Sequence, residues 1–209
     1  MDSKTNQTSI SLVIQAGGKS SRMGESKVLM PFLGVPLIQR VFERTNEIAQ
    51  EVLIVSNDPE ELEFMDVKLV SDSIPGKGAI GGLFTAMDKA SSELVAVVAC
   101  DLPFVSAAIL KEGARLLDLT GADVAIPRVN GDFYEPLHAV YRRQTCKTAI
   151  LQAIQADQRR LISWFASVQV LEMDEELCKQ LDPDGLAFFN INNKEDFLLA
   201  EQIEMRKSK

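Results

Sequence analysis

The residues of this chain that could carry chemistry gather in one Gly-rich stretch and at a few aspartates. The stretch AGGKSSRMGESK, from Ala16 to Lys27, contains two adjacent glycines and the basic side chains of Lys19, Arg22 and Lys27. Glycines let backbone N–H groups approach a phosphate closely, and Arg and Lys supply fixed positive charge. The stretch therefore favours an anion site for one phosphorylated ligand.

Two established phosphate-binding patterns do not fit this stretch. The pattern GxGxxG fails because Gly17 and Gly18 are adjacent, and the P-loop fails because its first glycine would fall on Val13. The loop nevertheless comes directly after an apolar segment, which is where open α/β sheets bind ligands. Phosphate binding is thus favoured over a solvated basic turn.

Two aspartates stand at comparable places further along the chain. Asp101 follows the apolar run LVAVVAC, where a carboxylate could hold Mg²⁺ or could cap the next turn. Asp72 precedes a second Gly-rich loop, PGKGAIGG, and its alternative role is an Asx-turn. On their own, these positions do not decide between a ligand-binding role and a structural role in a turn.

The scarcity of other reactive residues narrows the chemistry. The chain has one histidine, His138, and three cysteines without a CxxC pair, so a zinc site of soft ligands is not expected. We expect His138 to be a packed residue in a strand. Carboxylates, Lys, Arg, backbone amides and a hard metal ion are what remain.

Strand-like and helix-like segments alternate around these residues. Strands are expected at 10–15, 52–56, 67–70, 94–100 and 122–127, the last closed by its proline; helices are expected at 37–49, up to residue 89, and at 106–119 with Ser106 as N-cap. After these come a strand LHAVY, a helix at 143–155, a strand VQVLEM and a last helix after Asn193. This order predicts a three-layer, Rossmann-like α/β domain with a predominantly parallel sheet and antiparallel additions on one edge.

The composition is that of an ordinary folded domain. The 209 residues carry a formal charge of −8, with 46% hydrophobic and 25% charged residues, which argues against a polybasic binder of nucleic acid or membrane surfaces. The longest apolar runs are far shorter than the roughly 18 residues of a membrane span. We expect residues 1–9 to be a flexible N-terminus, residues 10–205 to form one domain, and the protein to be cytoplasmic, since the start lacks a secretory signal.

The segment QAGGKSSRMGESK, from Gln15 to Lys27, resembles the nucleotidyltransferase signature (L/A)-A-G-G-x-S-x-R-M-G-x-x-K. Within that superfamily the chain is similar to the molybdenum cofactor guanylyltransferases from about Leu12 to Ile203. The similarity includes SDSIPGKGAIGG, CDLP, EPLHAVY and NINNKEDF. It implies the fold of the nucleotide-diphospho-sugar transferases, with a nucleotide over the first loop.

The resemblance assigns roles in the first loop. Gln15, Ala16, Gly17 and Gly18 would bind the nucleotide, the first three through backbone groups along guanine and ribose. Lys27 would contact the phosphates, and Arg22 would hold their β/γ end. Gln15 stands where the family usually has Leu, and little consequence is expected, since the position acts mainly through its backbone.

The resemblance also assigns roles outside the first loop. Asp101 would bind Mg²⁺ with Asn192, beside Asn190, and Asp72 would contact the nucleotide. Either Ser56 or Asn57 would supply a further nucleotide contact. In the second loop Ala79-Ile80 replace the Pro-Leu of the usual GPLAG, and Gly82 follows Gly81 where Ala is common. Asn193 could cap the last helix in any case.

Candidates for the acceptor side are fewer. The family places the EPLHA segment near molybdopterin, so Glu135, Pro136 and His138 are candidates. Arg159-Arg160 could meet an anionic acceptor, although an Arg pair on a helix is usually a solvated face. Trp164 is expected in the core or at an interface.

The activity that the resemblance implies is Mg²⁺-dependent transfer of GMP from GTP to molybdopterin, with release of pyrophosphate. The alternatives are another nucleotidyltransferase, for molybdopterin cytidylyl transfer or for a sugar or isoprenoid phosphate, and a non-catalytic GTP-binding module. Expected partners are GTP, molybdopterin and proteins that deliver the cofactor, without nucleic acid or membrane. The expected state is a monomer or a weak homo-oligomer.

Overall fold

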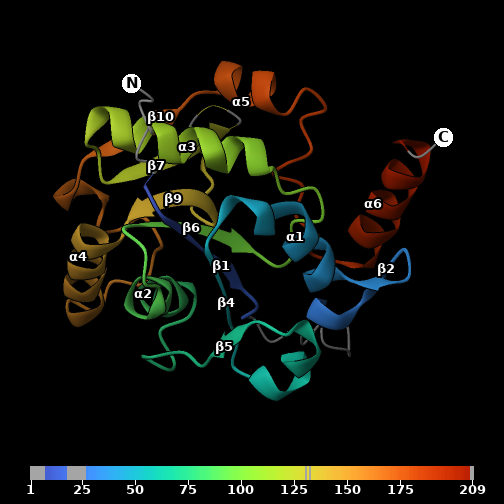
Figure 1. Ribbon diagram of the computed structural model, residues 1–209, viewed down its shortest axis with the longest axis horizontal. Coiled ribbons are helices and arrows are strands. Elements are labelled where there is room, and N and C mark those ends of the chain that lie inside the picture. The colour runs from blue at the N-terminus through green and yellow to red at the C-terminus, as the bar shows by residue number, and fades with distance from the viewer. Residues whose placement is uncertain (1–7, 18–26, 130, 132, 208–209) are drawn as a thin grey trace, which may run out of the picture.

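A central sheet runs through the molecule and carries helices on both faces (Figure 1). The computed structural model describes residues 8–17, 27–129, 131 and 133–207. Within them the sheet has eight strands in the order β10-β7-β9-β6-β1-β4-β5, with β8 paired to β7. The strands are β1 (Ile10–Gln15), β4 (Glu51–Val55), β5 (Lys68–Val70), β6 (Leu94–Ala99), β7 (Val124–Val129), β8 (Phe133–Tyr134), β9 (His138–Arg142) and β10 (Val170–Met173).

The helices divide between the two faces of the sheet (Figure 1). They are α1 (Leu37–Thr45), α2 (Ala79–Lys89), α3 (Ala107–Thr120), α4 (Arg143–Gln155), α5 (Glu175–Leu181) and α6 (Lys194–Lys207). Helices α1, α3 and α5 pack into one apolar cluster, and α2 and α4 pack into a second on the opposite face. Helix α6 instead covers a hairpin of β2 (Pro31–Phe32) and β3 (Val35–Pro36).

Strand β1 shows why the centre of the sheet is so apolar. All six of its residues are buried, because helices cover both faces. Leu12 and Ile14 face the cluster of α1 and α3, whereas Val13 faces the cluster of α2 and α4. Since side chains alternate along a strand, Gln15 falls on the same face as Val13, toward α2.

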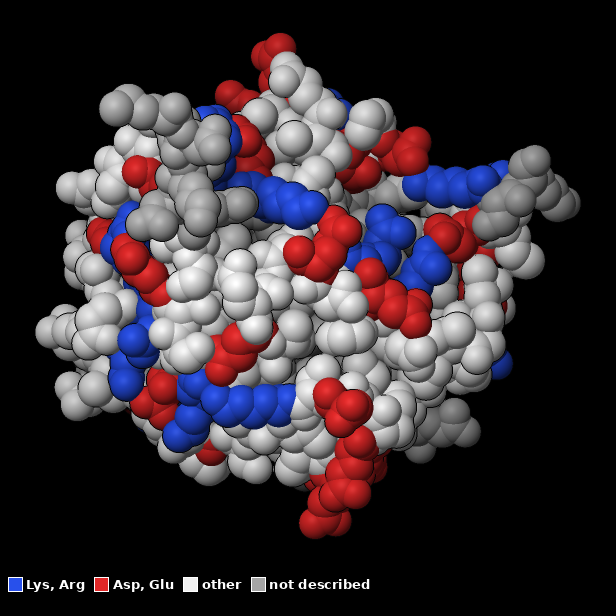
Figure 2. All heavy atoms as spheres, in the orientation of Figure 1, with Lys and Arg blue, Asp and Glu red and all other residues white. Residues whose placement is uncertain are grey.

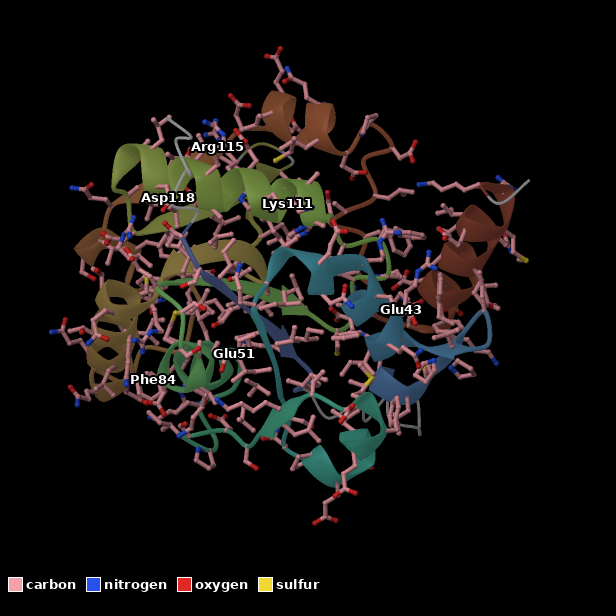
Figure 3. All side chains as sticks on the ribbon, viewed as in Figure 1. Glu43, Glu51, Phe84, Lys111, Arg115 and Asp118 are labelled. Carbon is pink, nitrogen blue, oxygen red and sulfur yellow. The ribbon has the colours of Figure 1, made fainter. Side chains whose placement is uncertain are left out.

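Charged residues of both signs are spread over the face seen in Figure 2, where Lys and Arg alternate with Asp and Glu. Helix α3 shows the same division within one element. Its buried residues include Ile109, Leu110 and Leu117, while Lys111 and Arg115 are exposed on its outer side (Figure 3). Such a helix separates the core from water by its 3.6-residue period.

The predicted α/β class with a mostly parallel sheet is confirmed, and so are several boundaries. Strand β1 and helix α4 have the predicted ends, and Ser106 caps α3 by accepting a hydrogen bond from the N–H of Ile109 at 3.4 Å. The helix predicted at 37–49 ends at Thr45 and continues as a 3-10 turn from Asn46 to Ile48.

Two expectations were wrong. The antiparallel strand β9 lies inside the sheet, between β6 and β7, and not on an edge. Pro127 does not close its strand, which continues to Val129; the β9 pairing ends at Ala125, so the missing N–H breaks no bond of that ladder. Arg159 and Arg160 lie in irregular chain after α4, beyond the predicted end of that helix.

Two further features bear on the whole chain. Helix α5, capped by Asp174, was not predicted, since its seven residues are too few to give a clear period. Among the residues that the structure describes, no helix has the length and apolar character needed to cross a membrane.

Candidate functional site

A pocket of about 710 Å³ lies at the carboxyl ends of the parallel strands. Gln15 ends β1, Val55 ends β4 and Ala99 ends β6, and all three line it. The second Gly-rich loop adds Gly78 and Ala79 at the start of α2. This is the edge at which parallel α/β sheets bind their ligands, as the sequence predicted.

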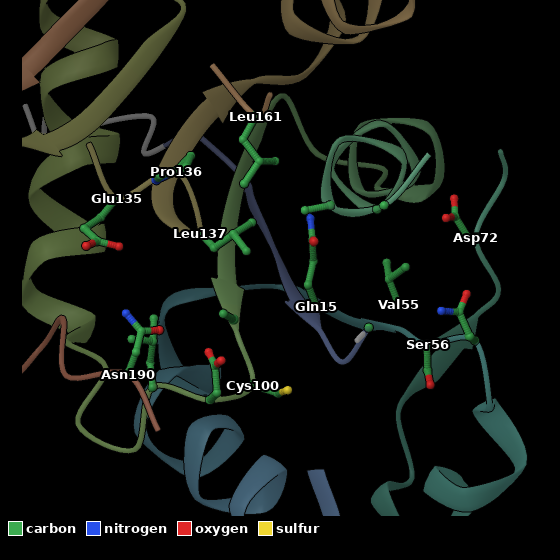
Figure 4. Close-up of a pocket in the computed structure, with 18 of the residues that line it drawn as sticks. Gln15, Val55, Ser56, Asp72, Cys100, Glu135, Pro136, Leu137, Leu161 and Asn190 are labelled. Carbon is green, nitrogen blue, oxygen red and sulfur yellow. The ribbon is translucent and has the colours of Figure 1, made fainter. Parts of the chain in front are cut away.

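The polar side chains of the pocket form two groups. Figure 4 shows Asp72 and Ser56 on one side, Glu135 and Asn190 on the other, and Gln15 between them. The charged residues among the described lining are all acidic: Asp72, Asp101 and Glu135. A phosphorylated ligand here would therefore need cations, from the protein or from a bound metal ion.

Asp101 and Lys27 meet in the structure. The ammonium of Lys27 donates to Asp101 Oδ2 at 2.8 Å, and the two side chains are 17% and 25% exposed. The second carboxylate oxygen, Oδ1, is buried and has no hydrogen-bond partner within the described residues. Buried polar atoms without partners are rare, and an unpartnered carboxylate oxygen is the kind of ligand that Mg²⁺ prefers.

The segment before α6 brings Asn190, rather than Asn192, to the pocket. The N–H of Ile191 donates to the carbonyl of Asp101 at 3.0 Å, which fixes this segment beside the aspartate. Asn190 donates through Nδ2 to the carbonyl of Phe188 at 3.3 Å, so its amide oxygen is the end left for a ligand. Asn190 lines the pocket.

Asn192 is exposed and does not belong to the described pocket lining. Its N–H donates to the carboxylate of Asp196 at 2.8 Å, which holds it just before the start of α6. Asn193 caps that helix, because its side chain accepts from the N–H of Asp196 at 2.8 Å. The capping prediction is confirmed, and it is Asn190, not Asn192, that lines the described pocket together with Asp101.

Asp72 forms the Asx-turn that its sequence position suggested. Its Oδ1 accepts from the N–H of Ile74 at 3.1 Å and from the hydroxyl of Thr85 at 2.8 Å, which is an Asx-turn tied to α2. The residue also lines the pocket. Ser56 and Asn57 line it as well, but the hydroxyl of buried Ser56 accepts from the N–H of Asp58, whereas Asn57 is exposed.

The start of the first loop is fixed by the sheet. The carbonyl of Gln15 accepts from the N–H of Cys100 at 3.0 Å, and the N–H of Ala16 donates to the carbonyl of Val55 at 2.8 Å. Gly17 lines the pocket, and among the described residues no atom lies within 4 Å of the place a Cβ would take there. The predicted sites Gly18, Lys19 and Arg22 lie outside the described residues.

The side chain of Gln15 was not expected to matter, yet it lies in the pocket (Figure 4). It is only 7% exposed, and its Nε2 is buried without a partner in the part of the chain described. The alternation along β1, which sends Gln15 to the α2 side, was the sequence signal that could have revealed this.

The acceptor-side candidates divide into lining and core residues. Glu135 and Pro136 line the pocket, and burial together with the charge of Asp101 raises the pKa of Glu135. His138 is fully buried, with Nε2 3.2 Å from the carbonyl of Ser106, and burial lowers its pKa to about 4. Trp164 is a core residue at 3% exposure.

All three cysteines are buried free thiols. Burial, followed by the charge of Asp101, raises the pKa of Cys100 to about 12, although this residue borders the pocket. Burial raises the pKa of Cys178 to about 11, and it raises that of Cys146 further. At neutral pH these thiols stay protonated, which excludes them as nucleophiles.

Comparison with known proteins places this geometry in a family. The MobA-like NTP transferase domain matches residues 12–171, which is most of the chain. The chain belongs to the MobA-like NTP transferases. The match begins inside β1 and ends inside β10, so it spans most of the sheet and all of the described pocket lining except Asn190.

Two curated relatives have similar lengths. A probable molybdenum cofactor guanylyltransferase of Natranaerobius thermophilus is 33% identical over 197 residues, covering 92% of this chain and 95% of the relative. One of Pelotomaculum thermopropionicum, also named a probable molybdenum cofactor guanylyltransferase, is 35% identical over 190 residues, covering 90% of each.

Solved structures agree on the fold. Molybdopterin-guanine dinucleotide biosynthesis protein A from Archaeoglobus fulgidus aligns with a TM-score of 0.81 and 25% identity, covering 94% of this chain and 99% of that one. A 4-diphosphocytidyl-2C-methyl-D-erythritol synthase from Anaerococcus prevotii aligns with a TM-score of 0.69 at 13% identity, covering 96% of this chain and 100% of that one. The second likeness concerns the fold alone.

Proposed function

We propose that this protein transfers GMP from GTP to molybdopterin and releases pyrophosphate. The observation that carries the proposal is the pairing of Lys27 with Asp101, which lines a pocket at the sheet's carboxyl edge, in a chain of the MobA-like family. The names of the curated relatives favour guanylyl transfer over the cytidylyl alternative. Retention of both charged residues argues against a non-catalytic module.

The residues suit a reaction that depends on charge and position. The terminal phosphate of molybdopterin is already ionised near neutral pH, so its attack on the α-phosphorus of GTP requires no strong general base. Lys27 would offset the charge that develops on the departing pyrophosphate. The glycines at the carboxyl ends of the strands would let the nucleotide lie against the backbone, in line with the acceptor.

The donor set fits a magnesium ion. The unpartnered Oδ1 of Asp101 and the amide oxygen of Asn190 are hard oxygen ligands on two pocket-lining residues, whose segments are joined by the hydrogen bond from Ile191 to Asp101. We propose that these two residues hold Mg²⁺, with Asn190 taking the role assigned by sequence to Asn192. When bound, Mg²⁺ would neutralise charge on the phosphate oxygens.

The remaining assignments stay predictions. Asp72 and the backbone at Gly17 would contact the nucleotide, and Arg22 and Gly18 keep their expected roles at the phosphates. Glu135 and Pro136 would meet the acceptor. The cytoplasmic location, the delivery proteins and the monomeric or weakly oligomeric state are likewise predictions.

The direct test is transfer itself. Purified protein, GTP, Mg²⁺ and molybdopterin should give the guanine dinucleotide and pyrophosphate, and CTP should not replace GTP. Asp101→Asn, which keeps the shape of the side chain, should lower the rate by about 10²-fold or more while the melting temperature stays close to wild type. Transfer of CMP instead of GMP, or a folded Asp101→Asn variant near the wild-type rate, would refute the proposal.

A thermal-shift series gives a simpler check on the nucleotide. With Mg²⁺ present, a ligand at 100 times its Kd should stabilise the folded protein by roughly 2.7 kcal/mol. GTP should therefore raise the melting temperature more than CTP, UTP or ATP does. The reverse order for CTP would favour the cytidylyl alternative.

A further inference from the structure

Gln15 is a polar side chain placed where an apolar one would bury more easily. It lies at the last position of β1, 7% exposed, and lines the pocket. Its Nε2 is buried and has no hydrogen-bond partner among the described residues. Because a buried donor without a partner destabilises the fold, such a group points to a ligand that completes it.

The backbone of this position is already engaged. The carbonyl of Gln15 accepts from Cys100, and the next N–H, of Ala16, donates to Val55. Both bonds tie the chain to the neighbouring strands β6 and β4. The carboxamide is therefore the part of Gln15 that can meet a ligand, and Figure 4 shows it reaching into the pocket beside α2.

Gly82 makes the space for this carboxamide. A Cβ built at Gly82 would lie 2.8 Å from Oε1 of Gln15 and 3.2 Å from its Cδ. Gly82 sits in the first turns of α2, where glycine is a poorer helix former than alanine. The side chain of Gln15 thus rests directly on the backbone of α2, at a position that only glycine leaves open.

We propose that the Gln15 carboxamide recognises the 6-oxo edge of the bound purine, and that Gly82 seats it there. This inference rests on the proposed function, in which GTP enters this pocket. The unpartnered Nε2 would donate to O6 of guanine. Adenine carries an amino donor at the same place, so the two donors would face each other and ATP would be disfavoured.

The test compares three purine nucleotides that differ at few atoms. GTP and ITP share the 6-oxo group, and ATP lacks it. Their Kd values with Mg²⁺ are measured by calorimetry on the wild type and on Gln15→Met, which keeps length and removes the hydrogen-bond groups. GTP and ITP should each bind about tenfold more weakly to the variant, and ATP should change little.

Other outcomes count against the proposal. If the binding of GTP, ITP and ATP weakens in parallel, Gln15 acts on the sugar, the phosphates or the fold, and base recognition is refuted. If the Kd of GTP is unchanged, the side chain does not meet the base. A wild type that binds ATP as tightly as GTP refutes it as well.

A double-mutant cycle tests whether Gly82 positions the carboxamide of Gln15. Gly82→Ala should weaken GTP binding about as much as Gln15→Met does. The new methyl group would displace the flexible end of the Gln15 side chain without breaking the fold. In a Gln15→Ala background, where that end is absent, the same change should leave the Kd of GTP unaltered. A further loss of GTP affinity in that background would show that residue 82 contacts the nucleotide directly, and the proposed positioning role of Gly82 would be wrong.

The two proposals fail separately. If no GMP reaches molybdopterin but Gln15→Met abolishes the preference for GTP and ITP over ATP, the acceptor is wrong and base recognition stands. If transfer from GTP occurs but the preference survives in Gln15→Met, the proposed function stands and the role of Gln15 is refuted.

Discussion

The ion pair of Lys27 and Asp101 joins two segments that are 74 residues apart in sequence. We expect Lys27→Ala to lower kcat/KM for GMP transfer by about 10²- to 10³-fold, because it removes positive charge from the pyrophosphate side. Steady-state kinetics measures the loss. Lys111→Ala is the matched control. Lys111 lies on the exposed side of α3, where its ammonium pairs with Glu47, so this substitution should leave the rate unchanged. A Lys27→Ala rate above a tenth of wild type would contradict the assignment.

For single residues, the sequence predicted which positions lie at the site better than it predicted which side chains point into it. Lys27 and Asp101 were both predicted as site residues, and the fold brings them together. The motif could not show that Gln15 uses its side chain, because that depends on which face of β1 meets Gly82. Nor could it separate Asn190 from Asn192, since two residues of irregular chain decide which amide turns inward.

Among the elements, α3 offers a local test. The hydroxyl of Ser106 accepts from the N–H of Ile109, which satisfies one of the free donors of the first turn. Ser106→Ala should lower the free energy of unfolding by about 1 kcal/mol, and Ser106→Asp should restore most of it. Urea denaturation of the three proteins measures this. Equal stability of the Ala variant would mean that the cap contributes nothing.

How far the elements could be predicted depended on their length and neighbours. The ends of β1 and α4 were correct, because a continuous apolar run and a regular period define them locally. The position of β9 inside the sheet was missed, since strand order is set by long-range pairing with β6 and β7. Helix α5 and the β2–β3 hairpin are short and depend on packing for their stability.

For the whole molecule, we expect stability to fall as the pH drops from about 6.5 to about 4. His138 is buried in its neutral form, and burial lowers its pKa from 6.5 to about 4. Within that window the unfolded chain binds a proton that the folded protein does not, so acid favours unfolding. The expected loss is on the order of 3 kcal/mol.

The His138→Gln variant isolates this effect. Gln keeps a donor for the carbonyl of Ser106 and does not titrate, so its melting temperature should depend less on pH between 6.5 and 4. Glu51, Asp88 and Glu135 also contribute to the pH dependence of stability, but they are present in both proteins and cancel in the comparison. Burial raises the pKa of Glu51, but hydrogen bonds from Ser11 and Ser91 outweigh it and lower the pKa to about 2. Hydrogen bonds from Lys147 and Lys89 lower the pKa of Asp88 to about 2. Parallel pH profiles for wild type and variant would contradict the role of His138.

The buried cysteines give the molecule a practical property. Because all three thiols are shielded and stay protonated at neutral pH, maleimide and similar reagents should react with them only slowly. Asn57, in contrast, is exposed at the rim of the pocket. An Asn57→Cys variant would then carry a single fast-reacting sulfur, so a fluorophore attached there could report nucleotide entry without removal of any native cysteine.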